Sequence, residues 1–291
     1  MTSYWPHLAD DKGEQGGRTP GEANGRFELS FLRHGRSTRI GRQFVSYPYH
    51  LTRPFALDPA IPELITVYQQ SSSGGLYRGE RLASHFRVGR NAAVHMTTQA
   101  ATVVHDCHGQ AVIQTTAIDL GEGSFLAWTP EPLVMFPGGL CTTATTVTVA
   151  AGAVVMIGEA FAWHDPSGLS RPFERLQSDL VLRDGRGKLL LRDSFAVSGA
   201  VLGGTSSPAG PWRHVSNFVL AGDSGRMPSR AGIENLVRDH LAIGVTALPN
   251  EAGWGIRCLA ADAVAARRFA ESLFGLCVEA AFGALPAARP K

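Results

Sequence analysis

Lysine is scarce in this 291-residue chain, which has only Lys12, Lys188 and Lys291 among its 27 basic residues. The 25 acidic residues nearly balance the basic ones, and no block of like charge occurs. This pattern predicts neither a nucleic-acid partner nor a polybasic membrane anchor. The positive charge rests on arginine, whose planar guanidinium suits paired hydrogen bonds and protein interfaces.

Cysteine pairs and long apolar runs are also missing. The four cysteines lie far apart without a C-x-x-C motif, which favours free thiols in a reducing compartment. No run reaches the roughly 18–20 apolar residues that a transmembrane helix needs. The first 26 residues lack the apolar stretch of a secretory signal. We therefore expect a soluble, cytoplasmic protein with no membrane partner.

The chain divides into a polar tail and one β-rich domain. Residues 1–26 have too little apolar surface to offset the entropy of ordering, so we expect a flexible N-terminal tail. From residue 27 to about 222, short runs of β-branched and aromatic residues alternate with glycine and proline. This pattern predicts a mainly β domain over residues 27–285, built as a sandwich, barrel or solenoid. No repeat of fixed period decides among the three.

Two segments have clear local patterns. Residues 180–182 and 189–191 are apolar and flank an Asp-Gly-Arg-Gly turn, which predicts a β-hairpin. Beyond residue 228 the apolar spacing becomes helical, first from Pro228 to Gly244 and again up to Gly283. We expect these two C-terminal α-helices to form a helical cap over about residues 228–283.

Residues 105–108 read His-Asp-Cys-His, four residue types that bind transition metals. Because alternate residues of a strand share a side, His105 and Cys107 can share a metal, with His108 as a further weak candidate. A structural zinc site needs four ligands, and no second Cys/His pair occurs at suitable spacing. The alternative is a strand that ends in a polar turn at Gly109, and the sequence leaves both open.

Residues 222–225 read Gly-Asp-Ser-Gly, the nucleophile loop of trypsin-like serine proteases. Such an enzyme also needs a general-base histidine and an orienting aspartate upstream. No histidine here has the matching context, and a helix start follows Ser224 within five residues. Since this composition is also common in turns, we expect a turn rather than a serine hydrolase that uses Ser224, and we expect no enzyme.

Three glutamates occur in strand-like or turn contexts. Glu80 follows a glycine-rich turn that is not a phosphate loop, because no Gly-Lys-Ser/Thr follows it. Glu131 lies between two prolines, and Glu159 lies within an apolar strand. A carboxylate in such a strand must pair, accept hydrogen bonds or face a water-filled cavity. The expected structural turn contains Gly74, Gly75 and Gly79.

Several segments, taken in order, resemble the UreD (also called UreH) family of urease accessory proteins. They are GGLYRGERL, MTTQAAT, WTPEPLVMF, IGEAFAWHDPSG, the hairpin LRDGRGKLLLRDSF, and GVTALPNEAGWGIRCLAAD. The resemblance covers about residues 27–285 and rests on their order and spacing. Arg78 stands where the family usually has a second glycine, Glu80 replaces its aspartate, and Pro132 replaces a glutamate. The chain therefore resembles a divergent member.

The resemblance implies a right-handed β-helical or β-solenoid-like core with a few helices, and a maturation factor rather than an enzyme. Family members bind apo-urease together with the helical protein UreF, which recruits the nickel-carrying GTPase UreG. A water-filled passage through UreD is thought to lead Ni²⁺ toward urease. We therefore expect no tightly bound cofactor and only transient nickel. A β-solenoid interaction module unrelated to urease is the alternative.

Two hypotheses on specific residues follow from the resemblance. The first places five oxygen-bearing side chains along or beside an ion passage: Glu80, Thr97, Thr98, Glu131 and Glu159. The second gives four apolar side chains near the C-terminus a share in the UreF interface: Leu236, Leu241, Phe269 and Leu273.

Overall fold

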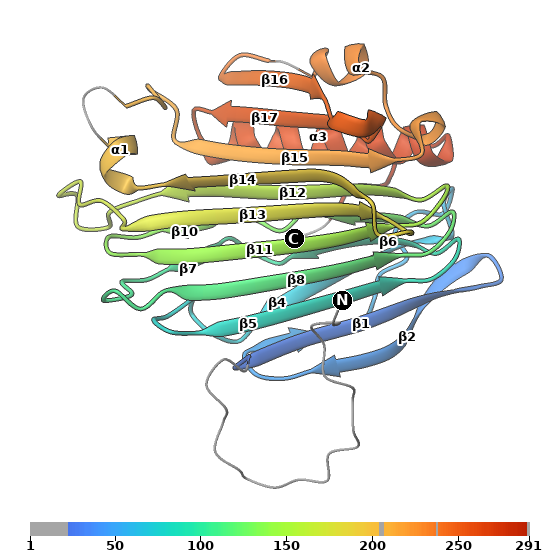
Figure 1. Ribbon diagram of the computed structural model, residues 1–291, viewed down its shortest axis with the longest axis horizontal. Coiled ribbons are helices and arrows are strands. Elements are labelled where there is room, and N and C mark those ends of the chain that lie inside the picture. The colour runs from blue at the N-terminus through green and yellow to red at the C-terminus, as the bar shows by residue number, and fades with distance from the viewer. Residues whose placement is uncertain (1–22, 204–206, 237, 290–291) are drawn as a thin grey trace, which may run out of the picture.

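The computed structural model describes residues 23–203, 207–236 and 238–289 (Figure 1). Most of the expected flexible tail, residues 1–22, lies outside this part of the chain. The first strand, β1 (Gly25–His34), begins two residues before the expected domain boundary.

The described chain forms two facing β-sheets. The seven-stranded front sheet contains, in order, β14 (Leu189–Val197), β13 (Arg175–Asp184), β11 (Leu140–Val149), β8 (Val112–Leu120), β5 (Arg81–Val88), β1 and β2 (Ser37–Val45). The ten-stranded back sheet contains, in order, β16 (Leu241–Ala247), β17 (Gly253–Ala260), β15 (His214–Gly222), β12 (Val154–Trp163), β9 (Phe125–Trp128), β6 (Ala93–Thr98), β4 (Leu64–Ser71) and β3 (Tyr49–Leu51). Its two remaining strands lie off this path, with β10 (Leu133–Met135) paired to β12 and β7 (Thr102–Val104) paired to β10. Figure 1 shows the front sheet nearest the viewer.

The chain winds between the two sheets as a solenoid. It passes from β4 in the back sheet to β5 in front, then to β6, β8, β9, β11, β12 and β13, so that each turn adds one strand to each sheet. Neighbouring strands of these turns are parallel, from β1 through β13 in front and from β4 through β12 behind. The structure therefore confirms the expected mainly β, solenoid-like fold.

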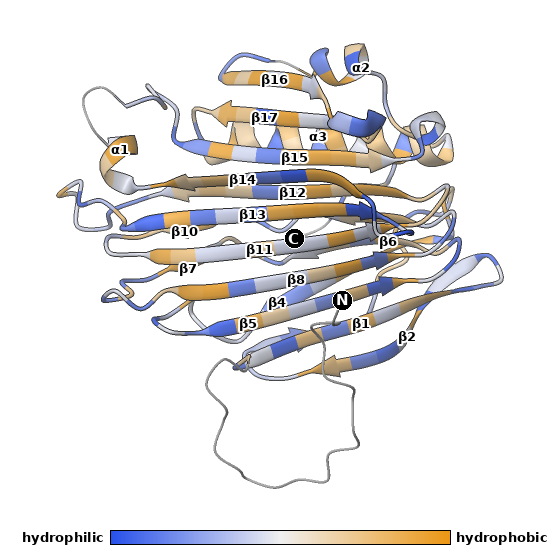
Figure 2. Cartoon of the chain, in the orientation of Figure 1, coloured by the Kyte–Doolittle hydropathy of each residue, from blue (hydrophilic) through white to orange (hydrophobic). Residues whose placement is uncertain are grey.

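Alternate residues of each strand face the space between the sheets. Near one end of the strands these inward side chains form an apolar cluster that includes Phe27, Phe86 and Leu180. Near the other end they form a second apolar cluster that includes Leu82, Cys141 and Leu176. The hydropathy colouring in Figure 2 shows hydrophobic and hydrophilic residues mixed along β5, β8 and β13, because each strand has one inward and one outward face.

The predicted hairpin is present as β13 and β14. The two strands are antiparallel, with Leu182 opposite Leu191, and the turn between them includes Gly187 at φ 85°. The Asp184 carboxylate accepts hydrogen bonds from the backbone N–H groups of Arg186 and Lys188, both at 2.9 Å. Local turn chemistry and the strand pattern therefore agree here.

The C-terminal region differs in part from the expected pair of helices. The described residues contain three α-helices, α1 (Gly199–Gly203), α2 (Arg230–Glu234) and α3 (Ala263–Phe282), and two 3₁₀ turns, η1 (Ser224–Arg226) and η2 (Pro249–Glu251). The helix expected over 228–244 ends at Glu234, and its second half becomes strand β16. Pairing with β17 explains the change, because it brings Ile243 and Val245 onto the same apolar cluster that a helix would have covered.

Helix α3 is the long helix of the cap and packs against the back sheet. Asp262 caps its first turn by accepting from the Ala265 N–H at 2.8 Å, and Gly283 at φ 72° ends it. Phe269, Leu273 and Cys277 are buried against the sheet.

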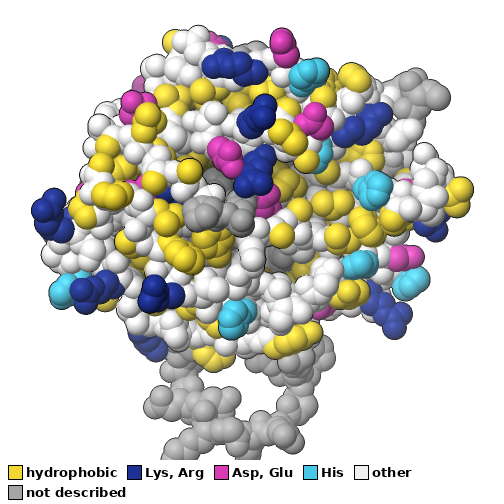
Figure 3. Space-filling model, turned by 180° about the vertical axis from the view of Figure 1, so that it is seen from behind, with side chains coloured by type: hydrophobic (Ala, Val, Ile, Leu, Met, Phe, Trp, Pro, Cys, Tyr) yellow, Lys and Arg dark blue, Asp and Glu magenta, His cyan; other side chains and the backbone are white. Residues whose placement is uncertain are grey.

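Among the described residues, no helix is long and apolar enough to cross a membrane. On the face turned away in Figure 1, basic and acidic side chains are interspersed (Figure 3).

A buried ion pair ties the segment after α3 to the loop before β4. The Arg289 guanidinium donates to both carboxylate oxygens of Asp58 at 3.0 and 2.8 Å, and the two side chains are only 8% and 1% exposed. The Ala287 N–H donates to the same carboxylate. Arg289 also lies over the Phe274 ring, 5.1 Å from its centroid. The pair therefore fixes the end of the helical cap against the solenoid.

We predict that Asp58→Ala destabilises the protein by about 3–5 kcal/mol, because it leaves the Arg289 charge buried without its partner. The exposed Arg230–Glu234 pair provides the control, since Glu234→Ala removes an i,i+4 contact that contributes less than about 0.5 kcal/mol. Urea unfolding followed by circular dichroism measures both. Equal losses in the two variants would show that the buried pair does not hold the cap.

Candidate functional site

A cavity of about 330 Å³ lies between the two sheets, between the two apolar clusters. Its walls come from front strands β5, β8, β11 and β13 and from back strands β4, β6 and β12. The inward positions here carry polar side chains, unlike those on either side. This polar belt consists of Gln69, Ser84, Thr98, Gln114, Thr116, Thr143, Thr145, Glu159 and Ser178.

Strand register aligns the polar belt across the front sheet. Ser84 on β5 is paired with Thr116 on β8, which is paired with Thr145 on β11. One step along, Thr143 on β11 is paired with Ser178 on β13. Paired residues of neighbouring strands share a face, so these hydroxyl groups form continuous rows along the solenoid axis.

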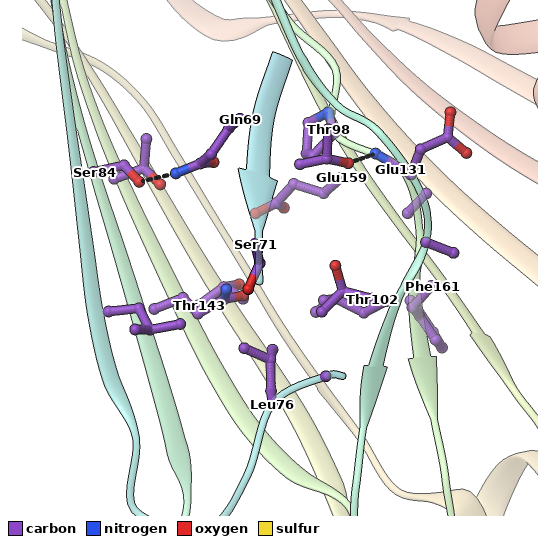
Figure 4. Close-up of a pocket in the computed structure, with 18 of the residues that line it drawn as sticks. Gln69, Ser71, Leu76, Ser84, Thr98, Thr102, Glu131, Thr143, Glu159 and Phe161 are labelled. Atoms are coloured by element: carbon purple, nitrogen blue, oxygen red, sulfur yellow. Dashed lines mark hydrogen bonds between the residues drawn. The ribbon is translucent and has the colours of Figure 1, made fainter. Parts of the chain in front are cut away.

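Hydrogen bonds join the polar belt across the gap between the sheets. Gln69 of the back sheet donates to the Ser84 hydroxyl of the front sheet at 2.8 Å (Figure 4). Three turns further along, the Ser178 hydroxyl lies 2.8 Å from each carboxylate oxygen of Glu159 and donates to that carboxylate. The cavity therefore has a cross-sheet polar contact toward each end.

The Glu159 carboxylate is the buried acidic group of this cavity, and it lies toward the β13 end. Burial raises its pKa above the ordinary glutamate value, although the hydrogen bond from Ser178 partly opposes this by lowering the pKa. Asp193 raises the pKa further, and Arg257 lowers it. Burial therefore favours the neutral form of this carboxyl group more than it would be favoured in an exposed glutamate.

Exposed residues at one side of the cavity mark its mouth. Ser71, Gln99 and Ala101 line the cavity and are exposed. Thr98 also lines this part, and its hydroxyl accepts a hydrogen bond from the Glu131 N–H at 2.8 Å. Figure 4 shows Thr98 beside Glu131, whose carboxylate turns away from the cavity centre.

The structure brings together three of the five ion-passage candidates. Thr98, Glu131 and Glu159 line the cavity, whereas Glu80 and Thr97 do not. Thr97 faces the opposite side of β6, where its hydroxyl donates to the Thr129 carbonyl at 2.7 Å. This is a correction of the expectation, and its cause is strand alternation: consecutive residues 97 and 98 cannot both face inward.

Glu80 closes the glycine turn instead of facing the cavity. Its carboxylate accepts a hydrogen bond from the Tyr77 N–H at 2.9 Å. Its charge still affects Tyr49, which lines the cavity. Burial is the main reason that the pKa of Tyr49 is raised to about 12, a hydrogen bond with Ser84 lowers this pKa, and the Glu80 charge raises it. Glu80 is therefore a structural group beside the cavity.

The glycines of this turn are required to different extents. Gly75 has φ +150°, and a Cβ there would lie 2.6 Å from the Val103 carbonyl oxygen. Gly79 has φ +71°, a conformation that other residues rarely adopt. Gly74, which has a negative φ, lines the cavity mouth beside Gly75. The tight approach of Gly75 lets Leu76 hydrogen-bond with β7.

The structure places the side chains of the ligand-rich stretch 105–108 in different environments. The His105 ring stacks on Tyr77 at 4.6 Å, the Cys107 thiol is buried and donates to the Leu140 carbonyl, and His108 is exposed at φ 46°. Among the described residues no group of three or more Cys, His, Asp or Glu side chains is placed to hold a metal ion. Weak nickel binding by His105, Cys107 and His108 therefore stays a prediction.

The Gly-Asp-Ser-Gly segment is a structural turn. Asp223 accepts from the Gly225 N–H at 3.0 Å and so caps η1. Next in the chain after Gly225, Arg226 donates to the carbonyls of Gly123 and Gly152, at 3.0 and 2.7 Å, and so joins two successive solenoid turns. Ser224 itself is exposed.

The four residues expected at the UreF interface are core or near-core positions. Phe269 and Leu273 are 2% and 0% exposed, and Leu236 and Leu241 are half-buried against the same cluster. Fully buried side chains cannot form a docking surface, so the expectation is wrong for Phe269 and Leu273. Helical periodicity identified the apolar face of α3 correctly, but that face packs on the back sheet.

Comparison with known proteins decides the family. The family model described as UreD urease accessory protein matches residues 23–291. The chain belongs to the UreD family. One UreD relative, urease accessory protein UreD 1 of Methylorubrum extorquens (strain PA1), is 37% identical over 265 residues, which cover 90% of each chain.

Two further relatives agree. Urease accessory protein UreD 3 of Bradyrhizobium sp. (strain ORS 278) is 40% identical over 258 residues, covering 88% of this chain and 91% of the relative. UreD 1 of Pseudomonas syringae pv. syringae (strain B728a) is 34% identical over 232 residues, covering 78% and 81%. UreD proteins are accessory proteins rather than enzymes, so the chain is neither a serine hydrolase nor a module unrelated to urease.

The polar belt in this UreD protein was only partly visible in its sequence. The sequence hypothesis contained Glu159 and Thr98 but missed Ser84, Thr116 and Ser178. The sequence does contain a signal for the missed residues. Two strands have a serine between two apolar residues at alternate positions, in Leu-Ala-Ser-His-Phe (82–86) and Leu-Gln-Ser-Asp-Leu (176–180). Several strands with this pattern indicate a polar layer inside an apolar core.

We predict that Glu159→Gln stabilises this UreD protein more at high pH than at low pH. Because burial raises the pKa of Glu159, the folded parent binds this proton more tightly than the unfolded chain does. The parent therefore loses stability as the pH rises from the ordinary glutamate pKa through the raised value, and the glutamine variant does not. Urea unfolding at several pH values between about 4 and about 8 measures the difference.

The exposed Glu122, which pairs weakly with Arg90 on the surface, provides the control. Glu122→Gln should leave the pH dependence of stability unchanged. If Glu159→Gln changed the free energy of unfolding by the same amount at both ends of the pH range, the fold would not raise the pKa of Glu159.

Proposed function

We propose that this protein binds apo-urease in the cytoplasm, together with UreF and through it UreG, and passes Ni²⁺ to urease through the cavity. The family assignment supports a role in urease maturation. The chemistry of the cavity supports its part in metal transfer.

One observation carries the proposal: the cavity wall suits a cation. Among the described residues that line it, Glu131 and Glu159 are acidic, and none is Arg, Lys or His. Hydroxyl and amide side chains supply most of the other polar groups, and a volume of about 330 Å³ has room for roughly ten waters. A partly hydrated divalent ion would therefore meet oxygen ligands and negative charge without positive side chains.

The same wall would bind nickel weakly. Imidazole nitrogen suits nickel, whereas carboxylate, carbonyl and water oxygens suit harder cations such as Mg²⁺. A wall of oxygens with one buried carboxylate therefore gives Ni²⁺ a path without a strong resting site. Such a wall suits transfer better than storage.

We predict that Glu159→Ala lowers the nickel content and the activity of urease matured in cells that hold all the accessory proteins, by about tenfold or more. The buried Glu159 carboxylate offsets much of the cost of bringing a divalent ion between the sheets, and its loss leaves Glu131 at the mouth as the acidic residue among the described lining residues. Metal analysis of purified urease, with activity per urease molecule, measures the effect.

Glu122→Ala is the matched control, since Glu122 lies on the surface away from the cavity. A second variant, Thr143→Phe, narrows the cavity and keeps every charge. Both cavity variants should still co-purify with apo-urease. Full nickel loading in both of them would rule out passage through this cavity.

We further propose that UreF contacts the exposed side of α3 rather than its buried side chains. Val264 is 58% exposed on this helix, and Arg268 and Glu271 are exposed on it as well. An exposed apolar side chain among charges can bury area in a complex while the monomer stays folded.

The double substitution Val264→Asp/Arg268→Glu should strongly reduce co-purification with UreF and leave the urea midpoint nearly unchanged. Phe269→Ala is the contrasting variant, because it creates a core cavity and should cost about 3–5 kcal/mol of stability. Unchanged UreF binding by the surface variant would place the contact elsewhere.

A further inference from the structure

The polar row in the back sheet continues beyond the cavity. Glu159 on β12 is paired with Asn217 on β15, and Asn217 is paired with Arg257 on β17. Directly paired residues of neighbouring strands lie on the same face of a sheet. The three side chains therefore form one row that leads from the cavity past the last turn of the solenoid.

The front sheet ends at its last strand, β14, which faces this row. This strand places Asp193 opposite Leu180 of β13, and the Asp193 carboxylate accepts a hydrogen bond from the Arg257 guanidinium at 2.5 Å. The back sheet continues past this edge through β17 and β16 (Figure 1). The ion pair is thus a bridge between the two sheets at the edge of the front sheet.

Exposure changes steeply along the row. The Arg257 side chain is 51% exposed and that of Asp193 is 26% exposed, whereas Asn217 is 9% exposed. The cavity itself reaches Glu159, Ser178 and Phe195. Asn217 therefore lies between the cavity and an ion pair that faces solvent.

We propose that this sheet edge is a second mouth of the cavity and that Arg257, held there by Asp193, is an electrostatic barrier to cations. The inference rests on the proposed function, because it names the element that controls one end of the same passage. The cavity wall has no positive side chain among its described residues, so the guanidinium is the first positive charge that an ion would meet beyond Glu159 in this direction. A cation that enters near Thr98 is therefore retained until the guanidinium moves aside.

Cysteine accessibility tests this barrier directly. Asn217→Cys places a thiol behind the ion pair, and the four natural cysteines are buried, so the parent chain gives the labelling background. The full-length protein is treated with a cationic reagent, aminoethyl methanethiosulfonate, and separately with its neutral methyl analogue. In either case the thiolate forms a disulfide with the reagent and methanesulfinate leaves, which mass spectrometry follows with time.

We predict that Arg257→Met, in the Asn217→Cys background, raises the labelling rate of the cationic reagent about fivefold relative to the neutral one. This is the size expected from one unit charge several ångströms away in a partly hydrated site. Arg257→Lys, which keeps the charge, should retain the slow cationic rate. Circular dichroism confirms that each variant is folded.

Two outcomes would overturn the inference. If Arg257→Met raises the labelling rates of both reagents by the same factor, Arg257 blocks access by its size and no electrostatic barrier exists. If Asn217→Cys resists both reagents in every folded variant, no second mouth exists. Neither result depends on urease, so failure of the barrier is distinguishable from failure of nickel passage, which the Glu159→Ala experiment reports.

Discussion

Strand alternation in a two-sheet solenoid is the constraint on which the site depends. Every second residue of each strand points into the closed space between the sheets, so a polar residue at such a position must find a partner there. Ser178 meets Glu159 across the gap, and Gln69 meets Ser84. Because successive turns stack in parallel register, these single positions become continuous polar rows.

The apolar clusters on either side give the cavity its direction. Side chains such as Phe86 and Leu180 fill the interior at one end of the strands, and Leu82 and Leu176 fill it at the other. The polar belt lies between them and runs across the strands, along the stacking axis. The cavity therefore extends along the solenoid axis, and the passage that we propose follows it from the mouth near Thr98 toward the ion pair at the last front strand.

The buried polar groups of this arrangement stabilise the fold less than apolar side chains would. An apolar side chain at 159 would fill the interior without a buried carboxyl group, whereas the glutamate there has its pKa raised by burial and is held by one hydroxyl. Buried polar groups that break the apolar pattern are expected at functional sites. Elsewhere the chain follows the ordinary rules, as in the Asp262 cap of α3 and the Gly187 turn.

Sequence predicted the elements whose pattern is local, such as the hairpin of β13 and β14 and the end of α3 at Gly283. It failed where a distant strand decides the outcome: Leu241 follows Val237 at the helical spacing of four residues, yet Leu241 lies in a strand paired with β17. The site shows the same division. Glu159 was identifiable as a carboxylate within an apolar strand, but its partner Ser178 comes from the opposite sheet, 19 residues away.

The central claim is that a divalent ion can occupy the polar belt. A crystal structure of the protein soaked in a nickel salt, with anomalous scattering recorded at the nickel edge, tests it most directly. The account predicts an anomalous peak between the sheets, within reach of the Glu159 carboxylate and surrounded by ordered water. Nickel found only at surface histidines, with the space between the sheets dry, would contradict it.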